Sequence, residues 1–250
     1  MPDLWAPARK LTAARIGLAR AGASLATTPL LDFRLAHARA RDAVHTELDT
    51  DRLRTDLHNI GAPTPIHIAE SAAPDRTTYL LRPDLGRQLK PGITLPRHPS
   101  DLAIVVSDGL SAAAAQSHAP VVLAALLPAL HQWRVAPIVI ARHGRVALGD
   151  AITLQRAAAS VLILLGERPG LSAPDSLGAY VTWNPTASTT DADRNCISNI
   201  RPEGLPPPEA ARRIWLLLER MRERGFSGVA LKDESAGTVA DAPALPTAER

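Results

Sequence analysis

Runs of consecutive apolar residues in the middle of the chain predict the strands of a buried sheet. The three clearest runs are residues 102–106, 137–140 and 161–165. They do not alternate with polar positions, which is typical of strands covered on both faces of a parallel sheet. Residues 179–183 form a further run of this kind, and we expect a fourth strand there.

Helical patterns lie between and after these runs. Residues 111–131 are rich in alanine and leucine and are long enough for a crossover helix, while residues 150–159 allow a shorter one. Residues 206–225 predict a last helix that begins at prolines and ends at Gly225. Because strands and helices alternate, right-handed crossovers should connect parallel strands. The predicted fold class is α/β: a Rossmann-like, open, mostly parallel sheet flanked by helices, with a helical N-terminal region.

The prediction of a helical N-terminal region rests on a less regular spacing of apolar residues. The apolar positions of residues 11–22 predict one helix, and a second begins where Thr28 can act as N-cap and Pro29 suits the first position. The expected inner face of the second helix is Phe33, His37, Ala40, Val44 and Leu48.

Residues 50–98 give a mixed pattern. Residues 66–68 alternate like a strand, residues 78–81 are the candidate for its partner strand, and residues 82–87 look like a turn into a short helix. The expected domain organisation has three parts. Residues 1–98 form a helical N-terminal region that packs on a partner subunit or on the core, residues 99–228 form an α/β domain with the ligand site, and residues 229–250 form a disordered tail.

Composition excludes several classes of protein. The 28 basic and 25 acidic residues are mixed along the chain, so we expect no nucleic-acid partner. The single cysteine, Cys196, excludes an intramolecular disulfide and a thiolate metal cluster within one chain. Residues 119–130 are the longest apolar run and are too short to span a bilayer, and the start lacks the apolar core of a signal peptide. We therefore expect an intracellular protein without a membrane partner.

Three loops that follow the predicted strands each place a glycine beside polar groups. They are residues 107–111, 142–146 and 166–170. The carboxyl ends of parallel strands meet at one edge of a sheet, where ligands bind. Glycine allows a close approach of main chain to ligand, so the sequence predicts a site of backbone groups together with Arg142, Glu167 and Arg168.

Motifs of other enzyme classes are missing from the sequence. It contains no glycine-rich dinucleotide fingerprint, no phosphate loop and no paired-histidine zinc motif. His143 lies in a strand-end loop but has no spacing partner typical of a metal site. Cys196 has no base in its local sequence, so a small thiol packed in a loop is the better interpretation. We predict no catalytic residue and no metal ligand in this chain.

Several long segments resemble, in the same order, the small (light, beta) subunit of ethanolamine ammonia-lyase. These segments are residues 12–16, 79–87, 106–111, 144–146, 165–171 and 193–200. The resemblance implies an adenosylcobalamin-dependent carbon–nitrogen lyase. Its large subunit is a TIM barrel that holds ethanolamine, and its small subunit covers the cobalamin from the side of the dimethylbenzimidazole tail. The implied reaction is cobalt–carbon homolysis, hydrogen abstraction, migration of the amino group and loss of ammonia to give acetaldehyde.

The same resemblance implies which residues contact the cofactor and what the chain assembles with. The family's cobalamin contacts fall on Val146, Glu167 and Cys196, and the α/β domain is then the cobalamin-binding domain. The partner is the large (heavy, alpha) subunit, in a hetero-oligomer built as a trimer of heterodimer pairs. The location is the cytoplasm, with a bacterial microcompartment as one setting. Position alone adds four secondary candidates for the site: Ser107, Asp108, Arg145 and Arg168.

Two other functions stay open from the residues. The first is a free-standing α/β enzyme that uses Cys196 or His143 on a small substrate, and it predicts activity in the isolated chain. The second is a non-catalytic interaction protein that binds a large subunit but no longer binds the cofactor.

Overall fold

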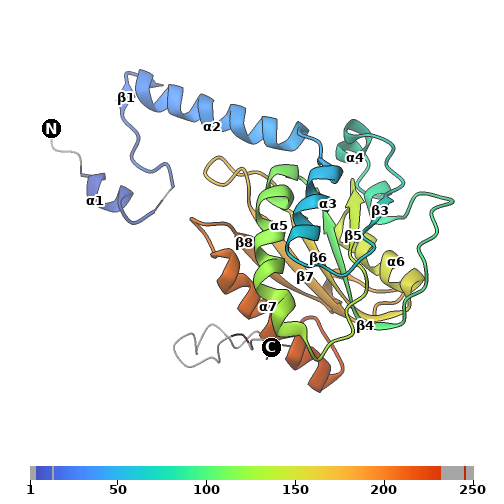
Figure 1. Ribbon diagram of the computed structural model, residues 1–250. Coiled ribbons are helices and arrows are strands. Elements are labelled where there is room, and N and C mark those ends of the chain that lie inside the picture. The colour runs from blue at the N-terminus through green and yellow to red at the C-terminus, as the bar shows by residue number, and fades with distance from the viewer. Residues whose placement is uncertain (1–3, 13, 232–244, 246–250) are drawn as a thin grey trace.

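The computed structural model describes residues 4–12, 14–231 and 245. Figure 1 shows the elements in chain order. They are α1 (Ala6–Arg9), β1 (Arg20–Ala21), β2 (Ser24–Leu25), α2 (Thr27–His45), α3 (Thr50–Asn59), β3 (His67–Glu70), α4 (Arg76–Leu81), the 3-10 helix η1 (Leu85–Arg87), β4 (Ser100–Ser107), α5 (Ala112–Leu126), η2 (Leu127–Leu130), β5 (Val139–Arg142), α6 (Val146–Arg156), β6 (Ala158–Gly166), β7 (Leu177–Trp183), η3 (Asp191–Asp193), β8 (Arg194–Ile200) and α7 (Pro207–Arg224).

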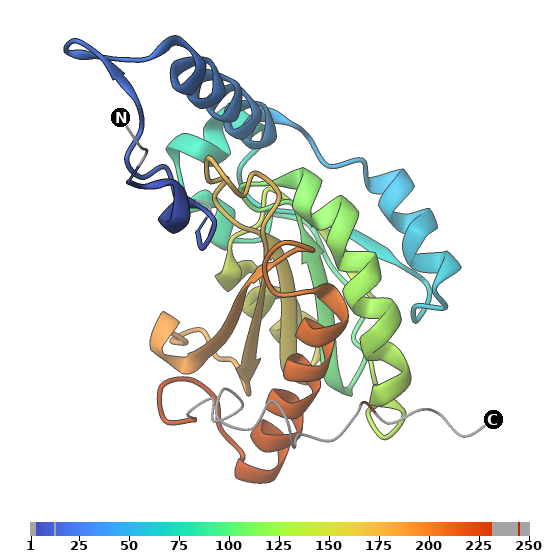
Figure 2. The same ribbon diagram turned by 90° about the vertical axis from the view of Figure 1, so that its left-hand side faces the viewer.

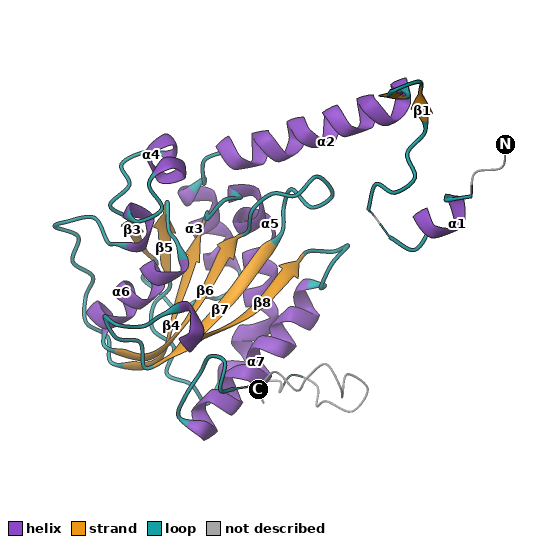
Figure 3. Cartoon of the chain, turned by 180° about the vertical axis from the view of Figure 1, so that it is seen from behind, coloured by secondary structure: helices purple, strands orange, loops and turns teal. Residues whose placement is uncertain are grey.

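The main sheet has six strands in the order β3-β5-β4-β6-β7-β8 (Figure 3). The first four strands pair in parallel. The last two run antiparallel to their neighbours. The predicted α/β class with an open, mostly parallel sheet is confirmed, and so are the four strands predicted at its centre. The sequence pattern did not reveal β8, because this edge strand exposes Cys196, Ser198 and Asn199 and so carries no continuous apolar run.

Helices cover the two faces of the sheet unequally. On one face α3, α5 and α7 pack over the larger apolar core, which includes Leu57, Leu123 and Leu218. On the other face α6 packs on β4 and β6 through Leu148 and Ile152. Figure 3 shows this second face, where α6 lies over one part of the sheet and β7 and β8 extend beyond it. The uncovered part is available for a ligand or for another chain.

Helix α5 has a long apolar sequence because it lies in the core of the fold. By length and composition alone, residues 112–130 are apolar enough to cross a membrane. In the fold, α5 packs on the sheet beside α7, and its Ala115, Val122 and Leu126 are fully buried. Burial inside this chain therefore accounts for its hydrophobicity.

The predicted helix over residues 11–22 is wrong. The described residues there form a turn-rich arm that ends in the β1–β2 hairpin. Gly17 and Gly22 have φ angles of +56° and +62°, a left-handed conformation that does not continue an α-helix.

The second N-terminal helix exists, but its start and its buried face differ from the prediction. Helix α2 begins at Thr27, with Ala26 as N-cap, so Thr28 is not the cap. Its buried residues are Ala36 and Ala43, and Phe33 of the predicted inner stripe remains 37% exposed. Figures 1 and 2 show the reason: α2 reaches past the edge of the sheet, so little of it has a surface to pack on.

Segment 78–81 is helical rather than a strand. Asp75 caps α4 by accepting a hydrogen bond from the Thr78 amide at 2.8 Å, and Tyr79 is then fully buried. The capping residue outweighs the β-propensity of the threonines and the tyrosine. The predicted strand near residue 67 and the predicted short helix near residue 85 are confirmed as β3 and η1.

The expected domain boundaries at residues 98 and 228 stay predictions. Strand β3 belongs to the segment before residue 99 and pairs with β5, so this segment contributes to the sheet. The disorder predicted for residues 229–250 falls outside the described residues, apart from 229–231 and 245.

Candidate functional site

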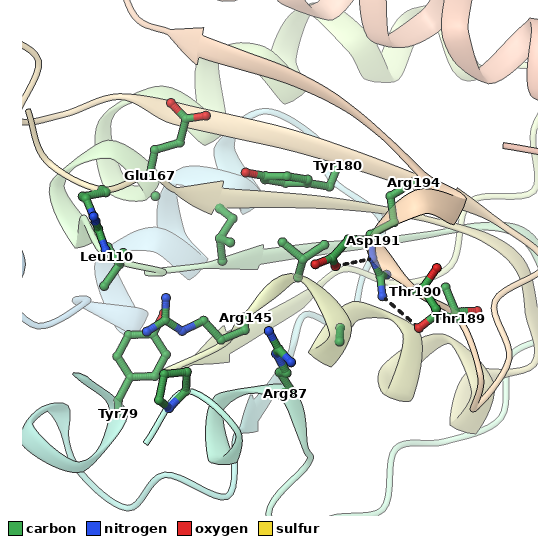
Figure 4. A pocket seen from close by; sticks show the side chains of 16 residues that line it. Tyr79, Arg87, Leu110, Arg145, Glu167, Tyr180, Thr189, Thr190, Asp191 and Arg194 are labelled. Carbon is green, nitrogen blue, oxygen red and sulfur yellow. Dashed lines mark hydrogen bonds and ion pairs between the residues drawn. The ribbon is translucent and has the colours of Figure 1, made fainter. Parts of the chain in front are cut away.

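A groove of about 830 Å³ opens at the carboxyl end of β6, between the start of α6, η1 and β7. Figure 4 shows the side chains around it. We call it the strand-end groove, and its lining is Tyr79, Pro83, Arg87, Leu110, Arg145, Val146, Ala147, Leu165, Gly166, Glu167, Arg168, Tyr180, Thr189, Thr190, Asp191 and Arg194. Val146 and Glu167, two of the three expected cofactor contacts, both line this groove, as do the secondary candidates Arg145 and Arg168.

The three glycine-containing loops meet at this edge of the sheet, as predicted. The amide of His143 donates to the Asp108 carboxylate at 2.7 Å, and the amide of Leu110 donates to the Gly166 carbonyl at 2.8 Å. A Cβ at Gly166 would lie 2.1 Å from the Ser111 carbonyl oxygen. Glycine at residue 166 is therefore required for packing of one loop on another, which differs from the close approach to a ligand that we expected.

Ser107 and Asp108 support the loops and do not line the strand-end groove. Both are buried. The Asp108 carboxylate accepts hydrogen bonds from Ser107 Oγ and from Arg76 Nη1, each at 3.1 Å. Arg142 also lies outside the lining, and its guanidinium faces Glu47 and Glu70 at 3.5 and 3.9 Å. All three side chains make their contacts within the chain, outside the groove lining.

Val146 is the first residue of α6, which begins four residues before the predicted start of this helix. No side chain caps this helix end, and no acidic residue occupies its first turn. The half-buried Val146 therefore presents both an apolar side chain and a backbone amide at the groove.

Glu167 is the first residue after β6 and is half-buried. Its Oε2 accepts hydrogen bonds from Ser176 Oγ at 2.5 Å and from the Asn199 amide at 3.2 Å. In the described part of the chain no donor is bonded to Oε1. A Cβ at residue 178 would lie 2.9 Å from that oxygen, so Gly178 leaves the room that the carboxylate occupies. One oxygen holds Glu167 in place, and the other is available as an acceptor.

Cys196 lies in the edge strand β8, whereas we expected it in a loop. It is opposite Tyr180 in the sheet, on the same face, and it is adjacent to the strand-end groove but not part of its lining. Cys196 is exposed at the edge of the sheet, yet the protein atoms around its sulfur raise the pKa of the thiol to about 11. Burial also raises the pKa of the Tyr180 phenol. Both groups are therefore neutral near pH 7 and are weak nucleophiles.

Five further side chains of the lining did not follow from the sequence pattern: Tyr79, Arg87, Tyr180, Asp191 and Arg194. Arg194 is held by buried Asp150 at 2.6 Å and by Asp191 at 3.4 Å. Burial raises the pKa of Asp150, against the lowering effect of Arg194. The sequence signals for these side chains were that Tyr79 and Arg87 are the first and last residues of one segment that carries the family resemblance, and that Arg194 lies in another, residues 193–200.

No group of three or more histidine, cysteine, aspartate or glutamate side chains within the described ranges could hold a metal ion. The chemistry that the strand-end groove offers is recognition. Apolar walls from Leu110, Val146, Leu165 and Tyr180 stand beside charged and amide groups, which suits a large ligand of mixed polarity.

Comparison with known proteins agrees with this architecture. Residues 2–232 match the family model described as ethanolamine ammonia-lyase light chain. A small subunit of this enzyme from Bradyrhizobium diazoefficiens is 52% identical, covering 91% of this chain and 90% of the relative. The small subunit from Xanthomonas campestris pv. campestris is 48% identical over 98% of this chain and 91% of the relative. The chain therefore belongs to the ethanolamine ammonia-lyase light chain family.

Proposed function

We propose that this chain binds adenosylcobalamin in the strand-end groove and holds it against the large subunit of ethanolamine ammonia-lyase. As a subunit of this carbon–nitrogen lyase, it takes part in converting ethanolamine to acetaldehyde and ammonia. The observation that carries the proposal is the placement of Val146 and Glu167 in one groove of about 830 Å³ in a chain of this family.

The residues present fit the cofactor. A corrin is a broad apolar disc with an amide fringe, and the strand-end groove combines apolar walls with the available Oε1 of Glu167. Glu167 is positioned to accept a hydrogen bond from an amide or hydroxyl, and Val146 supplies packing and a backbone donor. When bound, adenosylcobalamin supplies a radical by homolysis of its cobalt–carbon bond. The groove is open to one side, which leaves the remaining surface of the cofactor to the large subunit.

The role of this chain in the reaction is to bind and orient, without acid–base or nucleophilic chemistry of its own. The raised pKa values of Cys196 and Tyr180 keep both groups protonated at neutral pH. Cys196 lies at the margin of the groove, where its small side chain leaves space for the ligand beside Tyr180. The substrate and the steps on it belong to the large subunit.

The assembly that we propose is the hetero-oligomer implied by the resemblance, a trimer of heterodimer pairs with the large subunit. We also propose a cytoplasmic location, with enclosure in a bacterial microcompartment as one setting. The family name supports the large-subunit partner, since a small subunit requires one.

The test is a titration of the co-expressed complex of small and large subunits with cobalamin, followed by ultraviolet–visible absorption. Glu167→Gln should raise the dissociation constant about ten-fold or more, because a charge-assisted hydrogen bond contributes roughly 1.5 to 3 kcal/mol. Glu223→Gln, at an exposed position near the end of α7, is the matched control and should leave the constant unchanged.

An unchanged constant in Glu167→Gln would place the contact elsewhere. If Glu167 only fixes Ser176 and Asn199, the variant will lower the melting temperature and leave cobalamin affinity as it was. Absence of cobalamin binding in the wild-type complex would overturn the proposed function itself.

A further inference from the structure

The strand-end groove has an imbalance of charge that a corrin and its amides do not explain. Of its two acidic side chains, Asp191 pairs with Arg194 and Glu167 is held through one oxygen. Three arginines of the lining, Arg87, Arg145 and Arg168, have no carboxylate within ion-pair distance among the described residues. An excess of positive charge in a ligand groove favours an anionic group on the ligand.

Arg145 is the most constrained of the three. Its guanidinium lies over the Tyr79 ring, 4.5 Å from the ring centroid, and its Nε is buried with no hydrogen-bond partner in the described structure. Tyr79 is in turn fixed by a hydrogen bond from its hydroxyl to the Gly144 carbonyl at 2.9 Å. A Cβ at Gly86 would lie 2.9 Å from both Arg145 Cγ and Tyr79 Cε2. The fold therefore holds this cation in place without neutralising it.

Arg87 lies next to Arg145 because η1 is tied to the start of α6. The Arg145 amide donates to the Gly86 carbonyl at 2.8 Å, which brings residue 87 to the same side of the groove. Figure 4 shows Arg87 and Arg145 on one side and Glu167 and Tyr180 on the other. Arginine guanidinium groups on one side of a groove are well suited to binding phosphate oxygens.

The start of α6 adds further donors at this position. Neither the Val146 amide nor the Ala147 amide has an acceptor in the described part of the chain, and the helix has no acidic residue in its first turn. Uncapped helix N-termini stabilise anions through these amides and through the helix dipole. The helix end, Arg145 and Arg87 thus converge on one side of the groove.

We infer that Arg145, Arg87 and the start of α6 bind the phosphodiester in the nucleotide tail of the cobalamin. This inference rests on the proposed function and deepens it, since it assigns one side of the groove to the tail and the Glu167 side to other polar groups of the ligand. Of the two arginines, Arg145 is the anchor because Tyr79 already fixes its position, whereas Arg87 is exposed and must be ordered on binding.

The experiment compares two ligands on the co-expressed complex. Cyanocobalamin contains the phosphodiester, and dicyanocobinamide keeps the corrin and its amides but lacks the phosphate and the base. Arg145→Gln should raise the dissociation constant of cyanocobalamin about ten-fold or more. The constant of dicyanocobinamide should change less than about two-fold, since this ligand has no phosphate oxygen to accept a hydrogen bond from the guanidinium.

Further variants separate charge from structure. Arg87→Gln should show the same selectivity with a smaller effect, and Arg145→Lys should recover part of the cyanocobalamin affinity because it keeps the charge. Arg224→Gln, exposed at the end of α7, is the control and should bind both ligands as the wild type does. Added potassium chloride should weaken cyanocobalamin binding more in the wild type than in Arg145→Gln.

Three results would overturn the inference. Equal loss of both ligands in Arg145→Gln would make Arg145 a corrin contact or a structural residue. Equal affinity of the wild-type complex for both ligands would show that the phosphate contributes nothing. Inorganic phosphate that binds in an Arg145-dependent way, with cyanocobalamin unaffected by the substitution, would assign the site to free phosphate. A wild-type complex that binds neither corrinoid would instead count against the proposed function.

Discussion

Glu167 and Cys196, two of the three residues proposed to contact the cofactor, differ in chemistry. Glu167 keeps an available carboxylate oxygen because Ser176 and Asn199 occupy only the other one. The Cys196 thiol, with a pKa of about 11, remains protonated and faces Tyr180, so it offers little more than a small apolar volume. In the proposed site, Glu167 is the polar group that accepts a hydrogen bond from the cofactor, and Cys196 is the small side chain that leaves room for it.

Substitution of Cys196 tests the packing role. In the co-expressed complex, Cys196→Ala should keep most of the turnover at saturating cobalamin and lose about 1 kcal/mol of binding free energy, because only one small group is removed. Cys196→Trp should abolish cobalamin binding by filling the space beside Tyr180. Titration and acetaldehyde release are the two measurements. Loss of turnover in the alanine variant at saturating cobalamin would make the thiol a participant in the reaction.

Some site residues could be predicted from the sequence because their position follows from strand order alone. Glu167 directly follows a buried strand, and any residue at that place faces the carboxyl edge of the sheet. Tyr79 and Arg194 could not be found in this way. Tyr79 lies on a helix whose composition resembled a strand, and Arg194 begins an edge strand with no apolar run. Their contribution depends on tertiary packing, which a local pattern does not encode.

The elements that could be predicted are those whose sequence pattern is enforced by burial. Strands β4 and β6 are covered on both faces, and α7 combines an apolar face with prolines at its start and Gly225 in a left-handed conformation at its end. Helix α2 and the N-terminal arm have few buried residues, so little in their sequences restricts the pattern. Packing against the rest of the chain, rather than helix propensity, decided which predictions were correct.

Helix α7 contains an acid–base cluster that should make part of the stability depend on pH. Hydrogen bonds from Arg212 and Arg213 lower the pKa of Glu209 to about 2. A carboxyl with a pKa lower in the folded than in the unfolded state stabilises the fold above the unfolded value, here about 4.5, and loses this contribution as the pH falls towards 2. Because the three side chains are partly exposed, the contribution at pH 7 is about 1 kcal/mol.

Glu209→Gln measures this contribution by urea denaturation. The variant should be about 1 kcal/mol less stable than the wild type at pH 7, and the difference should shrink to less than half at pH 3. Glu223→Gln, about four turns further along the same helix and exposed, should show no difference at either pH. A difference that is the same at pH 7 and pH 3 would show that Glu209 stabilises α7 through packing or helix propensity instead of charge.

The whole molecule has the surface of a subunit. One face of the sheet is closed by three helices. The other is closed by α6 and residues 89–95 over β3, β5, β4 and β6, and β7 and β8 extend beyond this cover. Large apolar side chains stay exposed on the N-terminal arm and α2, with Leu11, Leu31 and Leu35 at 89%, 57% and 52%. Exposed apolar side chains that gather on one projecting segment are typical of an interaction surface. The strand-end groove and this projecting segment both present surface that a partner chain can cover.

The isolated chain should therefore release no acetaldehyde from ethanolamine and should bind cobalamin more weakly than the complex, because half of the cofactor surface would stay in water. Co-expression with the large subunit should give a hetero-oligomer of defined mass and restore both activities. Light scattering coupled to size exclusion measures the mass, and an alcohol dehydrogenase assay measures acetaldehyde. Activity in the isolated chain would favour the free-standing enzyme. A complex that forms but takes up no cobalamin would favour the non-catalytic interaction protein, since the chain would then bind the large subunit without binding the cofactor.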